Sequence, residues 1–64
     1  MPFVNINILE GTSDMQKQKI VEDITNTFQK NVGVSKDKVF IFFTDLKKNN
    51  YGKNGSLASN SENE

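Results

Sequence analysis

The residue with the most reactive chemistry to offer stands at the start of the chain. Met1 precedes Pro2, and a small second residue such as proline normally permits removal of the initiator methionine. Removal leaves Pro2 with a free secondary amine, whose reference pKa of about 7.7–8.0 falls when apolar surroundings penalise its charged form. Such an amine can act as a general base near neutral pH, or attack a carbonyl carbon to form an iminium ion. Many proteins begin with Met-Pro without using the proline in catalysis. The rest of the sequence is therefore needed to judge whether Pro2 is catalytic.

The residue types that the chain lacks narrow the chemistry further. It has no cysteine and no histidine, which excludes disulfides, thiolate nucleophiles, zinc–thiolate sites and the Ser–His–Asp triad. All eight basic residues are lysines, so no forked guanidinium can grip a carboxylate. Carboxylates, lysines, hydroxyls and one tyrosine remain, and we expect neither a metal ion nor a cofactor.

Charge and hydropathy limit the partners and the location. Eight lysines balance eight acidic residues for a formal net charge of zero, and a chain without surplus positive charge lacks the surface that binds nucleic acid. The longest apolar runs, Ile8-Leu9 and Val39 to Phe43, are far shorter than the roughly 20 residues that span a bilayer. The first residues show neither the basic segment nor the apolar run of a signal peptide. We therefore expect a soluble, cytoplasmic protein that binds neither nucleic acid nor membranes.

The chain is long enough for one small domain, with 64 residues of which 34% are apolar. We predict that this domain spans residues 2–55. Residues 56–64 include only two apolar residues and are predicted to form a flexible polar tail. Domains of about 60 residues that lack disulfides and metals often depend on oligomerisation, so we expect the subunits to complete one another's core.

Three elements are predicted to position the reactive residues. Alternation of apolar and polar side chains predicts a strand over residues 3–9, with three β-branched residues on one face. A second strand over residues 39–44 is apolar on both faces, which is typical of a parallel strand covered on both sides. Between them, apolar residues at three- and four-residue spacing predict a helix over residues 14–32. Lysines of this helix such as Lys17 are predicted to lie on its solvated face.

The ends of these elements carry their own signals. Ser13 and Gln16 have the spacing of a capping box, and Gly33 is a natural helix terminator. After the second strand, Asn54-Gly55 predicts a tight hairpin turn. The predicted fold class is α+β: a β-α-β unit with parallel strands and a right-handed crossover, followed by a short C-terminal hairpin. Two strands leave both edges of the sheet open, so we expect dimerisation to complete it.

Several segments occur in an order that is specific when taken together. They are Pro2 directly before a strand, Ile8 to Asp14 followed by Gln16-Lys17, Asp45 after the second strand, Tyr51 to Gly55, and Leu57 to Ser59. From residue 2 to residue 59 the chain thereby resembles the 4-oxalocrotonate tautomerase family. The resemblance implies β-α-β subunits that pair into dimers, with three dimers in a typical hexamer. It also implies that the amino-terminal proline is the acid and base in enol–keto isomerisation of 2-oxo acids.

The resemblance carries over position by position, with departures. Pro2 matches the catalytic proline, Leu9 an apolar residue near the pocket, and Tyr51 an aromatic residue of the pocket wall. Thr12 and Phe40 stand where the family typically has two arginines that hold and polarise the substrate, and Lys53 stands where an apolar residue is usual. We therefore predict that Pro2 is catalytic and that five residues bind substrate: Leu9, Thr12, Phe40, Tyr51 and Lys53.

Two functions stay open on this basis. The first is a tautomerase-like isomerase that uses Pro2 on a small-molecule carbonyl compound, and the second is a catalytically weak, oligomeric binding protein on the same scaffold. Each charge-assisted hydrogen bond to a carboxylate contributes roughly 1.5–3 kcal/mol. The two missing arginines therefore favour a mono-acid, an aryl enol or another carbonyl compound over a dicarboxylated muconate. We expect a homo-oligomer, with a mixed assembly that includes a second subunit as the alternative.

Overall fold

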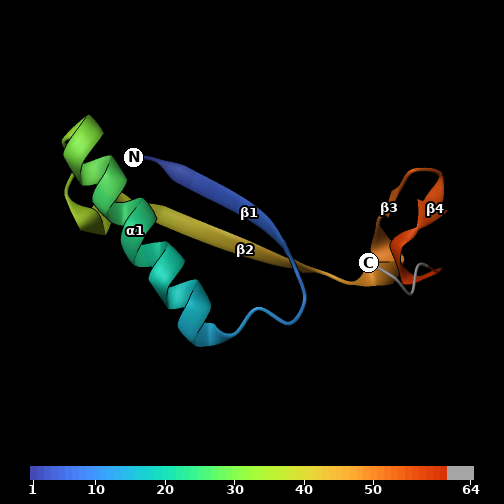
Figure 1. The fold of residues 1–64 in the computed structure, drawn as a ribbon. Coiled ribbons are helices and arrows are strands. Elements are labelled where there is room, and N and C mark those ends of the chain that lie inside the picture. The colour runs from blue at the N-terminus through green and yellow to red at the C-terminus, as the bar shows by residue number, and fades with distance from the viewer. Residues whose placement is uncertain (61–64) are drawn as a thin grey trace.

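The computed structural model describes residues 1–60 of the chain. Strand β1 (Phe3–Leu9) is followed by helix α1 (Asp14–Val32) and strand β2 (Phe40–Leu46), and two short strands, β3 (Gly52–Lys53) and β4 (Ser56–Leu57), follow. Strands β1 and β2 pair in parallel, whereas β3 and β4 form a separate antiparallel hairpin. Helix α1 lies against one side of the two long strands, and the hairpin lies beyond the end of β2 (Figure 1). The predicted fold class is confirmed.

The register of the parallel pair explains which side chains meet the helix. Phe3 pairs with Phe40 at one end and Leu9 with Leu46 at the other. Burial alternates along both strands, so one face of the sheet packs toward α1 and the other is open. The half-buried face carries Val4, Ile6, Ile8, Ile41 and Phe43, and the open face carries Phe3, Asn5, Asn7, Leu9, Phe40, Phe42 and Thr44. The prediction that both faces of the second strand are covered does not hold within one chain.

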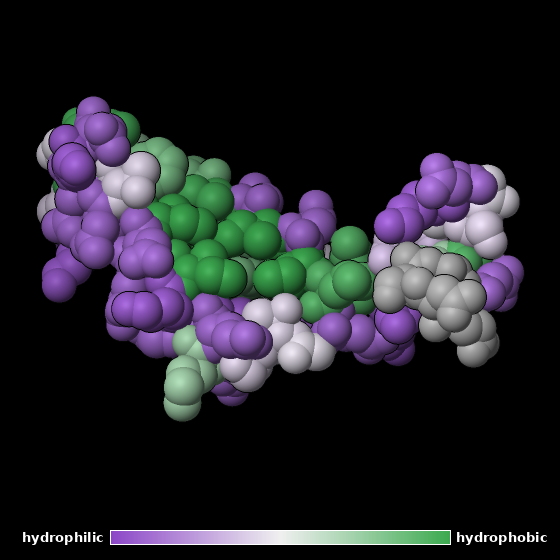
Figure 2. Space-filling view, viewed as in Figure 1, coloured by the Kyte–Doolittle hydropathy of each residue, from purple (hydrophilic) through white to green (hydrophobic). Residues whose placement is uncertain are grey.

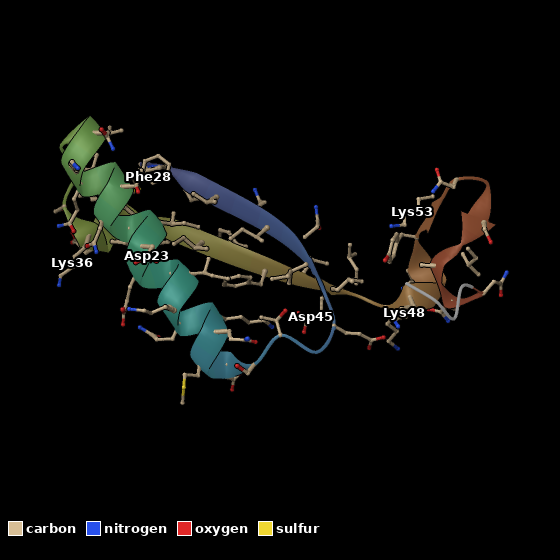
Figure 3. All side chains as sticks on the ribbon, viewed as in Figure 1. Asp23, Phe28, Lys36, Asp45, Lys48 and Lys53 are labelled. Carbon is tan, nitrogen blue, oxygen red and sulfur yellow. The ribbon has the colours of Figure 1, made fainter. Side chains whose placement is uncertain are left out.

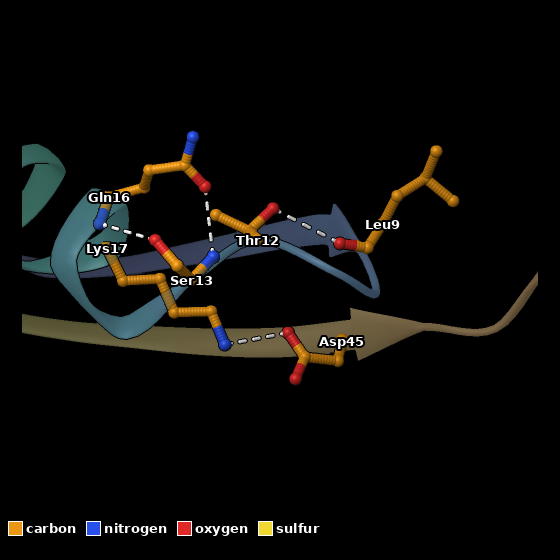
Figure 4. Close-up of polar contacts among 6 residues, drawn as sticks. All are labelled: Leu9, Thr12, Ser13, Gln16, Lys17 and Asp45. Carbon is orange, nitrogen blue, oxygen red and sulfur yellow. Dashed lines mark hydrogen bonds and ion pairs between the residues drawn. The ribbon is translucent and has the colours of Figure 1, made fainter.

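Helix α1 begins and ends where the sequence predicts. The backbone N–H of Gln16 donates to Ser13 Oγ at 3.1 Å, and the N–H of Ser13 donates to Gln16 Oε1 at 2.9 Å, which forms the predicted capping box (Figure 4). Gly33 has φ +82° and its N–H donates to the carbonyls of Phe28 and Gln29. Glycine adopts this left-handed conformation without a steric penalty, so the helix ends there.

The C-terminal hairpin is formed by the predicted turn. Asn54 and Gly55 both have positive φ, at +53° and +79°, as a two-residue turn of type I′ requires. The N–H of Ala58 then donates to the carbonyl of Tyr51 at 2.9 Å, and Ala58 is only 3% exposed. Of the predicted tail, residues 56–60 form strand β4 and a 3-10 turn. The rest of the predicted tail, residues 61–64, lies outside the described residues.

The second strand also differs slightly from its prediction over residues 39–44. Val39 ends a short 3-10 turn, in which its N–H donates to the carbonyl of Lys36 at 3.3 Å, so β2 begins at Phe40. At the other end, the N–H of Glu10 donates to the carbonyl of Leu46 at 2.9 Å and extends the pairing. Side-chain pattern alone does not reveal either hydrogen bond.

The chain by itself is extended and has little core. Its radius of gyration is 15.2 Å, against about 11 Å for a compact chain of this length. Its accessible surface is 5043 Å², whereas about 4,100 Å² is typical of a compact protein of this mass. Apolar side chains gather over the strands beside α1, where they stand open to solvent (Figure 2). The surplus surface is similar to what one partner buries in a standard protein–protein interface.

The helix itself gives no sign of a membrane span. Within residues 1–60, no helix combines the length and the apolar character that crossing a bilayer requires. Among the described residues, the large exposed apolar side chains include Phe3, Leu9, Phe40 and Phe42 on the open face of the sheet.

Candidate functional site

Pro2 stands at the start of β1, beside the start of β2. Its carbonyl accepts a hydrogen bond from the N–H of Phe40 at 3.0 Å, which holds the N-terminus against the second strand. The residue is half-buried. Its nitrogen forms the peptide bond to Met1, so the amine that the predicted chemistry needs exists only after Met1 is removed.

Phe40 is the predicted site residue that the fold brings to Pro2. Its ring stacks on the ring of Phe3, with the two centroids 5.2 Å apart and the planes 15° from parallel. Both rings lie on the open face, where Phe40 is 39% exposed and Phe3 is 61% exposed. Phe3 was not among the predicted site residues. The feature that could have identified Phe3 is the register of the parallel strands, which pairs Phe3 with Phe40.

Leu9 and Thr12 lie at the opposite end of β1. A strand of seven residues is roughly 23 Å long at about 3.3 Å per residue, and this length separates them from Pro2. The hydroxyl of Thr12 donates to the carbonyl of Leu9 at 3.3 Å (Figure 4). Thr12 therefore serves the turn between β1 and α1, and its side chain carries no charge for a carboxylate.

Tyr51 and Lys53 belong to the hairpin beyond the far end of β2. Tyr51 is half-buried and its carbonyl receives the N–H of Ala58. Figure 3 shows Lys53 on the hairpin, well apart from Lys36, which lies in the short 3-10 turn before β2. Since β2 begins beside Pro2 and ends toward the hairpin, these two residues lie far from Pro2 of the same chain.

One chain thus divides the six predicted residues among three places. Pro2 and Phe40 share one end of the sheet, Leu9 and Thr12 share the other end, and the hairpin holds the remaining two. No cleft within a single copy can contain all three groups. A pocket with all six residues requires contributions from more than one copy.

An ion pair between α1 and the end of β2 was not predicted. Lys17 Nζ lies 2.9 Å from Asp45 Oδ1 and 5.5 Å from the centre of the Phe43 ring, so it ties the first turns of α1 to the end of β2 (Figure 4). The prediction that Lys17 lies on the solvated face of the helix is wrong, because its side chain is only 21% exposed. The available signal was its three-residue spacing from Ile20, which puts it on the apolar stripe.

Comparison with known proteins adds to this geometry. The family model described as "Tautomerase enzyme" matches residues 2–60. The 2-hydroxymuconate tautomerase of Bacillus subtilis is 34% identical over 62 residues, which cover 97% of this chain and 100% of that protein. The crystal structure of YwhB, a homologue of 4-oxalocrotonate tautomerase, superposes with a TM-score of 0.87 at 33% identity, and the match covers 95% of this chain and 100% of that one.

A more distant structure shows the same fold. A heterohexameric 4-oxalocrotonate tautomerase from Chloroflexus aurantiacus J-10-fl has a TM-score of 0.82 at 19% identity, over 92% of this chain and 95% of that chain. The family match begins at Pro2 and runs through the C-terminal hairpin, so it includes all three places that hold the predicted site residues. The chain therefore belongs to the 4-oxalocrotonate tautomerase family of the tautomerase superfamily.

Proposed function

We propose that this protein is an isomerase that moves a proton between oxygen and carbon of a small enol or carbonyl compound, with Pro2 as the base and acid. The observation that carries the proposal is that the family match starts at Pro2, the one residue whose free amine suits this chemistry. The hydrogen bond from the N–H of Phe40 to the Pro2 carbonyl holds Pro2 beside the start of β2.

The reaction needs one proton-carrying group and no redox partner. The neutral amine of Pro2 takes the proton from the enol hydroxyl, and the electrons of the O–H bond form the carbonyl as the double bond shifts. The resulting ammonium then returns the proton to carbon, which restores the amine. A positioned group of this kind typically contributes 10²–10⁴-fold to a rate, and it works best when its pKa lies near the operating pH.

The same proposal includes an oligomer of identical chains. Three observations support it: the extended shape of the chain, its exposed apolar sheet face, and the separation of the predicted site residues. Copies of the chain would bring Leu9 and Thr12, or Tyr51 and Lys53, to Pro2 of a neighbour. A dimer that assembles into a hexamer is the arrangement that we propose, with a mixed oligomer as the alternative.

A second candidate function is a binding protein on this scaffold with little catalysis. It is favoured by the two side chains at the positions of the expected arginines. The Thr12 hydroxyl is used by a turn and the Phe40 ring is stacked on Phe3, so neither can hold a carboxylate. A bound carbonyl compound would then lack the charged groups that polarise it.

The two candidates are separated by one experiment on a single sample. The mass of the purified protein first establishes that Met1 has been removed, and enol–keto turnover is then measured with phenylenolpyruvate and with 2-hydroxymuconate. We expect Pro2→Ala to lower kcat/KM by at least about 100-fold, because the secondary amine is lost. The matched control is Met15→Leu, since Met15 is 82% exposed in the first turn of α1, at the opposite end of β1 from Pro2. Turnover that is absent, or equal in wild type and Pro2→Ala, would support the binding protein instead.

A further inference from the structure

We propose that Asn54 is a site of spontaneous deamidation, at which the chain modifies itself in the turn of the C-terminal hairpin and thereby opens that hairpin. The reaction consumes water and releases ammonia, and its products are aspartate and isoaspartate at position 54. The inference goes beyond the proposed function, because neither Pro2 nor a substrate takes part in the reaction.

Asn54 differs from the other asparagines of the chain in the residue that follows it. Of the nine asparagines in the sequence, Asn54 alone precedes a glycine. The backbone nitrogen of the following residue is the nucleophile in deamidation, and a side chain on that residue shields it. Gly55 has no Cβ, and a Cβ at this position would lie more than 4 Å from every atom of residues 1–60 other than its chain neighbours. Both Asn54 and Gly55 are exposed, so the attack is unhindered.

The chemical steps balance with water as the one co-reactant. The Gly55 nitrogen attacks the side-chain amide carbon of Asn54 and forms a C–N bond. Ammonia leaves with the proton of the Gly55 N–H, which closes a succinimide ring. Water then opens the ring at one of its two carbonyl carbons. Opening at the former side-chain carbonyl gives aspartate. Opening at the backbone carbonyl gives isoaspartate, in which the chain runs through the former side chain and gains one backbone carbon.

The closed turn keeps the two reacting groups apart, so the hairpin must open first. Asn54 and Gly55 have φ +53° and +79°, which fit a type I′ turn. In such a turn ψ of the first central residue is about +30°, so the Gly55 nitrogen lies nearly opposite to Cβ of Asn54. The hairpin has only two residues in each strand and lies beyond the end of β2, apart from α1 (Figure 1). A hairpin of this kind is marginally stable and opens readily.

The isoaspartate product does not fit the closed turn. A two-residue loop joins the paired residues Lys53 and Ser56, and loop length determines the register of a hairpin. One more backbone carbon in the loop therefore disrupts this pairing. The same hairpin holds Tyr51, whose carbonyl accepts the N–H of Ala58 at 2.9 Å. Deamidation at Asn54 thus releases the segment that carries Tyr51.

The first test follows the mass of the purified protein during incubation in mildly alkaline buffer. Fragmentation of its peptides locates each replacement of an amide NH2 by OH, and an isoaspartyl methyltransferase detects isoaspartate in the intact protein. We expect Asn54 to gain this mass, whereas Asn50, which precedes the bulky Tyr51, should not. Asn54→Gly keeps a residue suited to positive φ and should abolish the isoaspartate signal. A gain at Asn54 no faster than at Asn50 would overturn the inference.

A second variant tests the requirement for opening. A Cβ at Gly52 would lie 2.8 Å from the backbone carbonyl oxygen of Ser56, which is closer than van der Waals contact allows, so Gly52→Ala destabilises the closed hairpin. We expect the deamidation rate at Asn54 to rise about three- to tenfold in this variant. The matched control is Met15→Leu on α1, where Met15 is 82% exposed, and it should leave the rate unchanged. Equal rates in Gly52→Ala and wild type would contradict the opening step.

Hydrogen exchange at Ala58 measures the hairpin itself. Ala58 is 3% exposed and its N–H is bonded to the Tyr51 carbonyl. We expect this N–H to lose its protection in the isoaspartate form. Freshly purified Asn54→Asp carries the same new charge without the extra backbone carbon, so it should keep the protection. Protection that survives in the isoaspartate form would overturn the proposed effect on the hairpin.

The mass and exchange measurements do not depend on turnover, so they separate this inference from the proposed function. If turnover that depends on Pro2 is absent, the proposed function fails, and the mass gain at Asn54 still decides the inference. If such turnover is present and Asn54 gains no mass, the inference fails and the proposed function stands.

Discussion

One residue that we predict to bind substrate also makes a hydrogen bond within the fold. Thr12 illustrates this, because its hydroxyl donates to the Leu9 carbonyl within the turn after β1. A hydrogen bond of 3.3 Å at an exposed turn contributes little to stability. The position can therefore accept another side chain without loss of the fold.

Thr12→Arg tests what a guanidinium at this turn can do. We expect kcat/KM for 2-hydroxymuconate to rise by about 10- to 100-fold, since one charge-assisted hydrogen bond to a carboxylate contributes roughly 1.5–3 kcal/mol. The change for a substrate with one carboxylate should be smaller. Thr12→Gln serves as the control, because it adds length and hydrogen-bonding groups but no charge. An equal rise in both variants would show that charge at this position is not what limits the reaction.

Residue roles were only partly predictable from the sequence. The position of Pro2 and the departures at Thr12 and Phe40 could be read directly, because each depends on residue type and order. The stacking of Phe40 on Phe3 and the contact of Lys17 with Asp45 could not be, since each joins residues far apart in the chain. Such contacts depend on the register of two parallel strands, and side-chain alternation does not define that register.

At the scale of elements, the helix and the hairpin follow from local signals alone. The capping box at Ser13, the terminator at Gly33 and the turn at Asn54-Gly55 all form as predicted. Each involves residues within five positions of one another, so short-range chemistry is sufficient to define it. The boundaries of β2 were less accurate because its pairing with β1, which is distant in the chain, sets them.

The cap at Ser13 allows a quantitative test of the helix. Ser13→Ala should lower the free energy of unfolding by about 1 kcal/mol, because the N–H of Gln16 loses its acceptor. Denaturant unfolding at a fixed protein concentration measures this. The control is Ser35→Ala, since Ser35 also precedes a helical segment but makes no capping bond to the backbone. If the two variants lose the same stability, the capping bond contributes nothing specific.

The whole molecule is the scale at which the isolated chain is least complete. Ala58 is the one buried apolar residue among residues 1–60, and a domain with so thin a core is marginal by itself. The composition led to the prediction that this chain depends on oligomerisation. It could not predict which face is open, because that required knowing which side of the sheet α1 covers.

Oligomerisation has a consequence for stability that can be measured directly. Association that accompanies folding makes the unfolding midpoint depend on protein concentration. We expect the Tm to rise by several degrees over a roughly 100-fold increase in concentration, with the mass in solution equal to a multiple of the subunit mass. A Tm that is constant over this range, together with a monomer mass, would contradict the proposed oligomer. The stabilities of single-residue variants should therefore be compared at equal protein concentration.

The division of the predicted site residues among three places has a genetic counterpart. If pockets are completed across copies, Pro2 and Tyr51 of one chain serve different pockets. Suppose that one cell makes a chain mutated at Pro2 and a second chain mutated at Tyr51. The two mutations would then affect different pockets of the mixed oligomer. Some pockets of their mixed oligomers would combine an intact Pro2 with an intact Tyr51. Two inactive alleles of the gene would thus complement each other.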